Sequence, residues 1–240
     1  MEIQASSRVT RTLVLAATLV MATITMVASA VAAPTDFRDP RLVPPNTVIG
    51  NYTFGEWGDA WWNWAVREPS ATNPNVDPTG EFNARNQTAD PVWFLAGVFN
   101  GRFANRTVVV PSNRYIFFPL INALEAGGGT EAEMRFRLNR LINSVTRLEL
   151  IVDGVRVRNL FKYRAQSPRG GFVLRVPPNS LFTEFGARPG NYAPAVQAGY
   201  WIMLRPLPVG EHKIIFEAYQ GDSNLVQRVI YRVLVRKRVF

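Results

Sequence analysis

Apolar and polar residues alternate in short runs from residue 91 onward, and this period of two predicts β-strands. The runs are rich in β-branched and aromatic residues and are separated by Asn, Gly and Pro, which favour turns. Asp153-Gly154 indicates a tight hairpin, because this pair supplies the positive φ angles that the turn requires. The expected strands are Val92–Phe99, Thr107–Val110, Tyr115–Leu120, Arg147–Val152, Val155–Leu160, Phe172–Val176, Gly199–Arg205, Lys213–Tyr219 and Leu225–Val235.

Short strands with regular turn signals between them predict a mainly β fold, namely a single antiparallel β-sandwich of the jelly-roll or immunoglobulin-like type. We expect the first three strands to be neighbours in one sheet, and the last strand to lie at a sheet edge, guarded by its charged residues.

Two segments have the three-to-four residue period of an amphipathic helix instead. A Trp-rich helix is expected over residues 53–67, with Thr53 as its cap. A second helix is inserted between strands, where Thr130 and Glu133 form a capping box. Its apolar positions are Met134, Leu138, Leu141, Ile142 and Val145.

The first 32 residues have the layout of a secretory signal peptide. Arg8 and Arg11 precede an apolar segment from Leu13 to Val27, and small residues follow it. The apolar segment falls short of the roughly 20 residues that a membrane-spanning helix needs. We therefore expect export to the periplasm or the medium and no transmembrane segment after cleavage. An uncleaved anchor is the alternative.

Residues 33–240 are expected to form one domain, in which 33–52 is a Pro-rich arm laid over the sandwich. The chain has no cysteine, which excludes disulfides, a lipoprotein anchor and thiolate metal sites. A single histidine, His212, excludes a His-based zinc site, and no Gly-x-Ser-x-Gly elbow is present for it to serve. The sequence indicates no cofactor and no metal.

Basic residues outnumber acidic ones by 27 to 18, giving a formal charge of +9. Such a charge favours acidic polymers as partners, although it also serves solubility alone. Arg232 and Arg236 lie on one face of the last expected strand, where they form a candidate stripe for an anionic polymer. We expect no nucleic acid partner, and the oligomeric state stays open.

Acid–base chemistry would have to use carboxylates. Glu56 and Asp59 are three residues apart on the Trp-rich helix, so they share a face among rings that desolvate a carboxyl group and stack on sugars. Glu125, near Asn122, is a third candidate. Acidic residues in a first helical turn also simply complement the helix dipole, which is the alternative.

Four tryptophans lie within eight residues of the first helix. Helical spacing places Trp57, Trp61 and Trp64 on one face, where we expect them to pack in the core. Trp62 points elsewhere and, with Asn63, is a candidate stacking platform for a ligand.

Several motifs are specific enough to support a resemblance. They are Gly55-Glu56-Trp57, Trp61-Trp62-Asn63-Trp64, Asn73-Pro74, Asp77-Pro78-Thr79-Gly80, Pro91-Val92-Trp93-Phe94-Leu95-Ala96-Gly97, Arg106 with Pro111, Phe117-Phe118-Pro119 with Asn122, Val152-Asp153-Gly154 and Pro206-Leu207-Pro208 with Gly210-Glu211-His212. With them the chain resembles a family of uncharacterised exported bacterial proteins.

The resemblance implies export and a single domain but no activity or ligand. Members of that family often have two cysteines where this chain has Asn83 and Val108. If those cysteines pair, the tie between loop and sheet must rest on packing in this chain.

The first hypothesis is a non-catalytic exported β-sandwich that binds an extracellular polysaccharide or another anionic envelope polymer. The residues expected to bind it are Trp62, Asn63, Asn122, Arg232 and Arg236. The alternatives are a secreted glycoside hydrolase that uses Glu56 and Asp59, and a structural envelope subunit that associates with its own copies.

Overall fold

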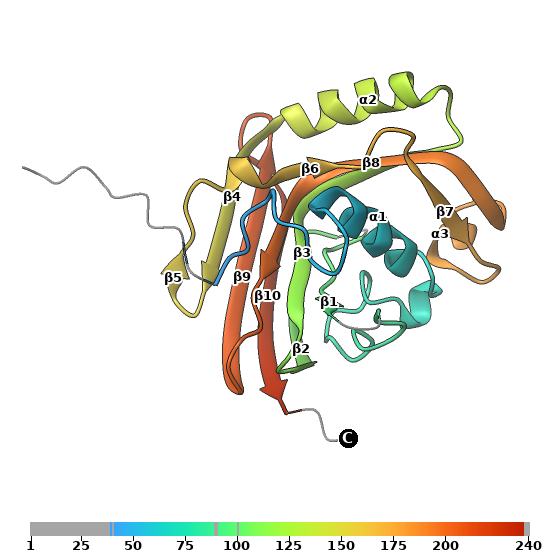
Figure 1. Cartoon of the computed structure of the whole chain (residues 1–240). Coiled ribbons are helices and arrows are strands. Elements are labelled where there is room, and N and C mark those ends of the chain that lie inside the picture. The colour runs from blue at the N-terminus through green and yellow to red at the C-terminus, as the bar shows by residue number, and fades with distance from the viewer. Residues whose placement is uncertain (1–38, 40, 89–90, 100, 238–240) are drawn as a thin grey trace, which may run out of the picture. The chain divides into compact units, whose positions relative to one another are not determined.

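Two five-stranded sheets and three α-helices make up the part of the chain that the computed structural model describes. That part is residue 39 and residues 41–88, 91–99 and 101–237 (Figure 1). The chain divides into two units, Met1–Asp36 and Phe37–Phe240, and every described residue belongs to the second. The signal peptide predicted over 1–32 lies outside the described residues.

Sheet I contains the strands that carry the candidate site. Its order is β1-β3-β8-β6, and β7 pairs with another part of β8. β1 is parallel to β3, and the other pairs are antiparallel. The bounds are β1 Val92–Phe94, β3 Tyr115–Ala126, β6 Arg164–Gln166, β7 Phe172–Val176 and β8 Gly190–Leu204.

Sheet II has the order β2-β10-β9-β4-β5. β2 is parallel to β10, while the other neighbours are antiparallel. The predicted tight turn between β4 and β5 is confirmed, since Asp153 and Gly154 have φ angles of 50° and 79°. The bounds are β2 Phe103–Pro111, β4 Val145–Val152, β5 Val155–Arg156, β9 Gly210–Gln220 and β10 Asn224–Arg236.

The mainly β, sandwich-like fold predicted from the sequence is confirmed, and each sheet includes one parallel pair. The prediction that the first three strands share one sheet is wrong, because β2 belongs to sheet II. β1 ends at Phe94 because the chain then crosses between the sheets. The backbone N–H groups of Ala96 and Val98 donate to side chains of β10, those of Tyr231 and Gln227.

The sequence predicted that the last strand lies at a sheet edge, and this prediction is wrong. β10 lies between β2 and β9, and its parallel register with β2 runs from Arg228 opposite Phe103 to Arg236 opposite Pro111. The sequence could not indicate this pairing, because more than a hundred residues separate the two strands.

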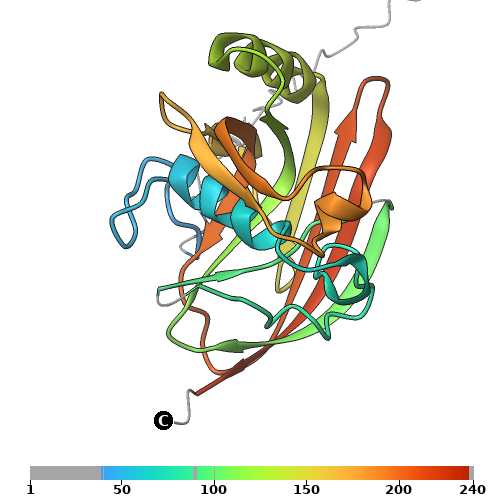
Figure 2. The same ribbon diagram turned by 90° about the vertical axis from the view of Figure 1, so that its right-hand side faces the viewer.

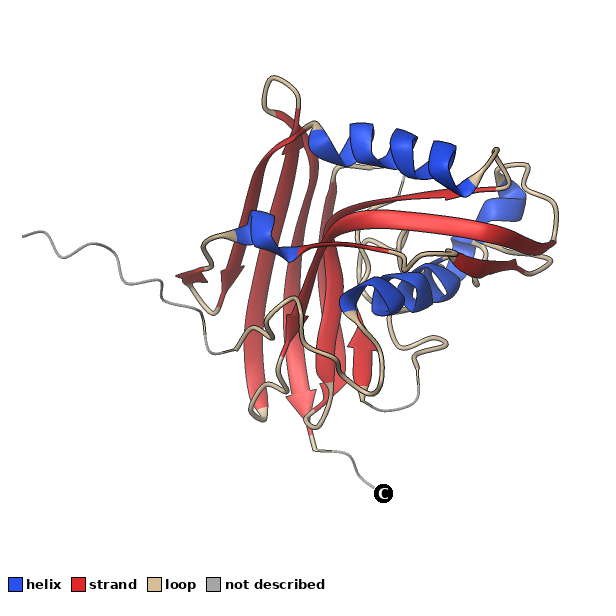
Figure 3. Cartoon of the chain, turned by 45° about the horizontal axis from the view of Figure 1, so that its top comes forward, coloured by secondary structure: helices blue, strands red, loops and turns tan. Residues whose placement is uncertain are grey.

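The three α-helices are α1 (Phe54–Ala65), α2 (Glu131–Asn143) and α3 (Leu181–Glu184), and two short 3₁₀ helices span Ser70–Thr72 and Leu160–Tyr163. The predicted capping boxes of the two longer helices are confirmed at Thr53 and Thr130. Figure 3 shows α2 lying along β8 across one end of the sandwich. No described helix is long and apolar enough to cross a membrane.

Both faces of sheet I are buried. One face packs against sheet II and α2, through Ile202 and Leu204 among others. The other face, with Trp201 and Met203, packs against α1. Figure 2 shows α1 on the side of sheet I away from β9 and β10. A strand covered on both faces needs no polar side, which explains the long apolar run of β8.

Candidate functional site

Helix α1 is fixed to sheet I by a buried polar network. The Ser167 hydroxyl donates to Asp59 Oδ1 at 2.5 Å and accepts from the backbone N–H of Gln197 at 2.9 Å. The Gln197 amide in turn donates to the carbonyl of Gly55 at 3.0 Å and accepts from Trp201 Nε1 at 3.1 Å. The network holds one side of α1 against β8 and the segment that follows β6.

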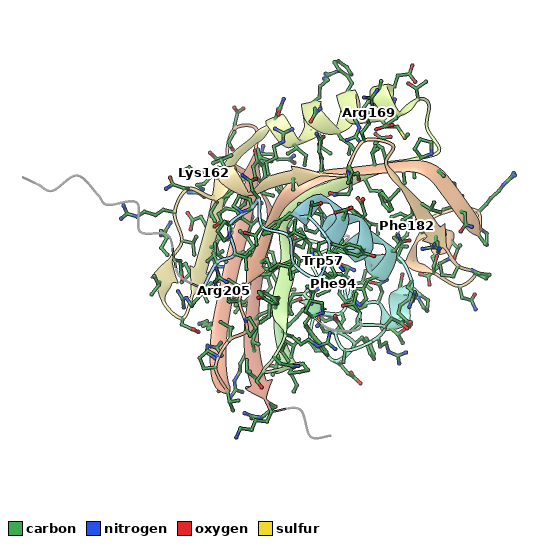
Figure 4. All side chains as sticks on the ribbon, in the orientation of Figure 1. Trp57, Phe94, Lys162, Arg169, Phe182 and Arg205 are labelled. Atoms are coloured by element: carbon green, nitrogen blue, oxygen red, sulfur yellow. The ribbon has the colours of Figure 1, made fainter. Side chains whose placement is uncertain are left out.

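The prediction that Trp57, Trp61 and Trp64 pack in the core is confirmed, since each is at most 4% exposed. Figure 4 shows Trp57 beside Phe94 beneath α1, with ring centroids 6.1 Å apart. The indole N–H of each of the three donates to a backbone carbonyl at 2.8–3.0 Å. Trp62 differs, because it is half-buried and its Nε1 is buried without any acceptor.

A pocket of about 200 Å³ lies beside Trp62. Phe182, labelled in Figure 4 beside α3, forms an aromatic wall with Trp62 and Phe99, at centroid distances of 6.2 and 6.3 Å. We call this cavity the Trp62 pocket. Its lining residues are Trp61, Trp62, Ala65, Val66, Asn75, Gly97, Val98, Phe99, Asn122, Leu181, Phe182 and Gln227.

Two hydrogen-bond donors of the Trp62 pocket are unused. The Nε1 of Trp62 and the Nδ2 of Asn122 are both buried and have no partner. Gln227 is fully engaged, because its Oε1 accepts from Val98 N and its Nε2 donates to Leu120 O. Buried donors without acceptors cost free energy, so the pocket is suited to a guest that presents oxygen acceptors.

The pocket wall is held from behind by Arg106, a fully buried arginine of β2. Its guanidinium donates to the carbonyls of Gly97 at 2.7 Å and Asn75 at 3.4 Å, and both residues line the pocket. It also donates to the carbonyls of Asp77 and Ala96 and to the hydroxyl of Tyr231.

Hydrogen bonds as well as packing tie the loop between α1 and β1 to the sheets. From the sequence, packing alone was expected to replace the paired cysteines of the similar family. Arg106 Nε donates to Asp77 O at 2.7 Å, Thr107 N donates to Thr79 O at 2.8 Å, and Asn83 Nδ2 donates to Phe94 O at 3.1 Å. Hydrogen bonds thus hold this loop in the absence of cysteine.

An open groove of about 610 Å³ runs along another face of α1 and shares no lining residue with the Trp62 pocket. We call it the α1 groove. It brings together three of the predicted site residues, Glu56, Asp59 and Asn63. The other lining residues are Tyr52, Ala60, Trp64, Arg67, Asn86, Gln87, Thr88, Pro168, Gly171, Phe172, Val173 and Arg175.

The two carboxylates of the α1 groove have opposite environments. Glu56 accepts hydrogen bonds from the backbone N–H and the hydroxyl of Thr53, and these bonds lower its pKa. Burial raises the pKa of Asp59 to about 6, while hydrogen bonds from Ser167 and Gln197 oppose the rise. Glu56 therefore caps the helix as an anion, whereas Asp59 can hold a proton near pH 6.

Asp59→Asn is expected to raise the free energy of unfolding at pH 7 by about 2 kcal/mol and to leave it unchanged near pH 3.5. Between pH 3.8, the ordinary value, and about 6, native Asp59 retains a proton that the unfolded chain releases. Its contribution to stability is thus complete below this window and is lost as pH rises through it. Urea unfolding from pH 3.5 to 7 measures the effect.

Asp222→Asn, at an exposed position in the turn between β9 and β10, is the control for that measurement. It should shift the stability curve by less than 0.5 kcal/mol, as is usual for surface substitutions. A difference between wild type and Asp59→Asn that is the same at every pH would contradict the raised pKa.

The amide of Asn63 is occupied by protein groups. Its Oδ1 accepts from the backbone N–H of Arg175 at 2.8 Å, and its Nδ2 donates to the carbonyl of Val173 at 3.1 Å. Because β7 pairs only with β8, this amide supplies the partner that the other edge of β7 lacks. Asn63 thus shapes the α1 groove by locking β7 onto α1.

The remaining candidates lie elsewhere. Glu125 pairs with Arg137 of α2 at 3.0 Å and lines neither the Trp62 pocket nor the α1 groove. Arg232 binds both carboxylate oxygens of Glu211 at 2.6 Å on the outer face of sheet II, and Arg236 is exposed at the end of the same strand. Asn122 joins Trp62, whereas the two arginines are remote from both cavities.

The two ring nitrogens of His212 lie 2.8 Å from Asp153 Oδ2 and 2.9 Å from the Pro208 carbonyl. They connect the β4–β5 turn to the start of β9, which is a structural position. Among the described residues, no group of three or more His, Cys, Asp or Glu side chains is arranged to hold a metal ion.

Sequence reasoning missed Phe99, Phe182, Arg67 and Arg175. The spacing of Arg67, four residues after Asn63, could have placed it near the exposed face of α1. The other three come from strands, loops and a one-turn helix whose positions depend on tertiary packing, so no local pattern signals them.

No family model matches the chain, and no curated protein matches it significantly. Among solved structures, it is similar to the cysteine protease inhibitor EhICP2 from Entamoeba histolytica, at 12% sequence identity and a TM-score of 0.23. The match covers 56% of this chain and 95% of the inhibitor. At this TM-score the likeness supports no conclusion about function.

Proposed function

We propose that this protein is an exported, non-catalytic β-sandwich protein that binds one sugar unit of an extracellular polysaccharide in the Trp62 pocket. One observation carries the proposal: Trp62 and Asn122 line the same aromatic-walled cavity, and the side-chain N–H donor of each is buried with no partner among the described residues. Sugars offer hydroxyl and ring oxygens as acceptors and apolar ring faces for stacking. The layout of residues 1–32 supports the extracellular source of the ligand.

The size of the pocket supports a single unit. At about 200 Å³ it is smaller than the roughly 300–1,000 Å³ typical of small-molecule sites. A side branch or chain end fits such a volume, whereas a longer segment would extend beyond it.

Trp62→Phe is expected to weaken polysaccharide binding about tenfold, because it removes one hydrogen bond, worth about 1.4 kcal/mol, but keeps an aromatic ring. Binding is measured by retention on insoluble cell-wall polysaccharides and by calorimetry with oligosaccharides released from them. Asn122→Leu should have a similar effect, because it removes the second donor.

Phe103→Leu, at an exposed position on β2, is the control and should leave the affinity unchanged. Absence of retention by the wild-type protein, or equal affinity of wild type and Trp62→Phe, would contradict the proposal. Thermal unfolding of each variant separates a lost contact from a lost fold.

A second candidate function, glycoside hydrolysis at Glu56 and Asp59, is favoured by the opposite pKa shifts of these two carboxylates. Against it, the capping contacts of Glu56 and the Ser167 contact of Asp59 already engage both groups. Release of reducing sugar by the wild type, abolished in Asp59→Asn, would establish hydrolysis; no release is the result expected for a binding protein.

A further inference from the structure

The α1 groove continues into a second cavity of about 400 Å³. The two cavities share Asn63, Arg67 and Arg175, so they adjoin at these residues, beside α1 and β7. The second cavity is otherwise lined by Val176, Pro177, Pro178, Gly190 and Asn191. No carboxylate lines this second cavity.

Arg67 and Arg175 are exposed, and among the described residues neither guanidinium has an ion pair or a hydrogen bond. Other arginines of the chain behave differently: Arg41, Arg137 and Arg232 each bind a carboxylate at 2.6–3.0 Å. Two unpaired positive charges that line one cavity create a local field that attracts an anion.

Both arginines lie near the contact that Asn63 makes between α1 and β7. Asn63 holds the backbone of Arg175 through a 2.8 Å hydrogen bond, and Arg67 lies two residues after Ala65, where α1 ends. Arg175 lies on the outward side of β7, since its neighbours Leu174 and Val176 are buried. Arg175 is therefore held beside α1, and Arg67 belongs to the bend that directly follows this helix.

We propose that the α1 groove binds an acidic polysaccharide, with a carboxylate or sulfate of one sugar held between Arg67 and Arg175. A guanidinium presents paired N–H donors that match the oxygens of such groups. Further along the groove, Tyr52 is 45% exposed and Phe172 is half-buried, and these rings offer surface to neighbouring sugars. The identification of the polymer as a polysaccharide rests on the proposed function, whereas the location of the anion site does not.

The carboxylates at the other end of the groove do not prevent this binding. Glu56 is engaged by Thr53, and burial keeps Asp59 largely protonated below about pH 6. They place the negative end of the groove away from the two arginines. An acidic sugar at the arginine end, followed by neutral sugars toward Tyr52, matches this distribution of charge.

The test compares Arg67→Gln/Arg175→Gln with Arg158→Gln/Arg205→Gln, which removes the same charge from exposed arginines that line neither cavity. Figure 4 shows Arg205 on the opposite side of the ribbon from Phe182. The probes are polygalacturonate for the carboxylate, dextran sulfate for the sulfate and dextran as the neutral polymer. Affinity is measured at several salt concentrations.

We expect the Arg67/Arg175 variant to lose at least tenfold in affinity for one acidic probe, with a shallower salt dependence, while the control pair changes less than twofold. Which acidic probe is affected identifies the group that is bound. Equal losses in both pairs, or no loss in either, would overturn the inference.

The variants also separate this inference from the proposed function. Loss of binding in Trp62→Phe with full binding in the Arg67/Arg175 variant would contradict binding in the α1 groove and support binding in the Trp62 pocket. Full binding in Trp62→Phe with loss of binding in the Arg67/Arg175 variant would contradict binding in the Trp62 pocket and support binding in the α1 groove.

Discussion

Arg106→Met is expected to lower the free energy of unfolding by about 4 kcal/mol, the largest effect that we predict for a single substitution. Arg106 is 1% exposed, and its guanidinium donates to four backbone carbonyls and one hydroxyl. Met fills a similar volume but leaves the carbonyl oxygens of Asp77 and Gly97 buried without a donor, and each such loss is costly. Urea unfolding followed by tryptophan fluorescence measures the loss.

Arg102→Met, four residues earlier at an exposed position, is the matched control and should cost less than 0.5 kcal/mol. Arg106→Lys keeps the charge but not the planar fork, so we expect it to recover only part of the stability. A loss below 1 kcal/mol in Arg106→Met would show that the carbonyls find other partners.

Gly55→Ala is expected to destabilise the protein by about 3 kcal/mol, although Ala favours a helix over Gly by about 1 kcal/mol. A Cβ at Gly55 would lie 2.1 Å from the carbonyl oxygen of Gln166, a backbone atom of β6. The helix cannot move away without disturbing Trp57 and Trp61, which are anchored in the core on its other side. Thermal and urea unfolding measure the loss.

Ala60→Gly, on the groove side of α1, measures the effect of helix propensity without a steric clash. We expect it to lower the free energy of unfolding by about 1 kcal/mol. A Gly55→Ala protein as stable as wild type would mean that α1 and β6 are further apart than described. The same variant should also weaken binding, because α1 contributes to both cavities.

The elements that the sequence predicted well are those determined by neighbours in the chain. The capping boxes at Thr53 and Thr130 and the Asp153-Gly154 turn each need only a few consecutive residues. Helical spacing likewise placed the three buried tryptophans of α1 in the core.

Pairings between distant segments could not be predicted in this way. The parallel pairing of β2 with β10 joins segments more than a hundred residues apart, and the chain after β1 reaches β10 through hydrogen bonds to the side chains of Tyr231 and Gln227. The burial of both faces of sheet I likewise depends on where α1 docks. Alternation within one strand carries no information about either feature.

The candidate site shows the same limit. Trp62 and Asn122 were each selected from the sequence, but only the packing of α1 against β3 brings them to one pocket. Asn63 was selected as a ligand amide, yet its amide binds the edge of β7. The residue types indicated which hydrogen bonds and ring contacts each side chain can make, and the tertiary contacts decided which partners it has.

The central place of β10 in sheet II has a consequence for the order of folding. Before residues 224–236 leave the ribosome, β9 can pair only with β4, and β2 has no strand to join. The core between the sheets is therefore completed only after residues 224–236 have been made.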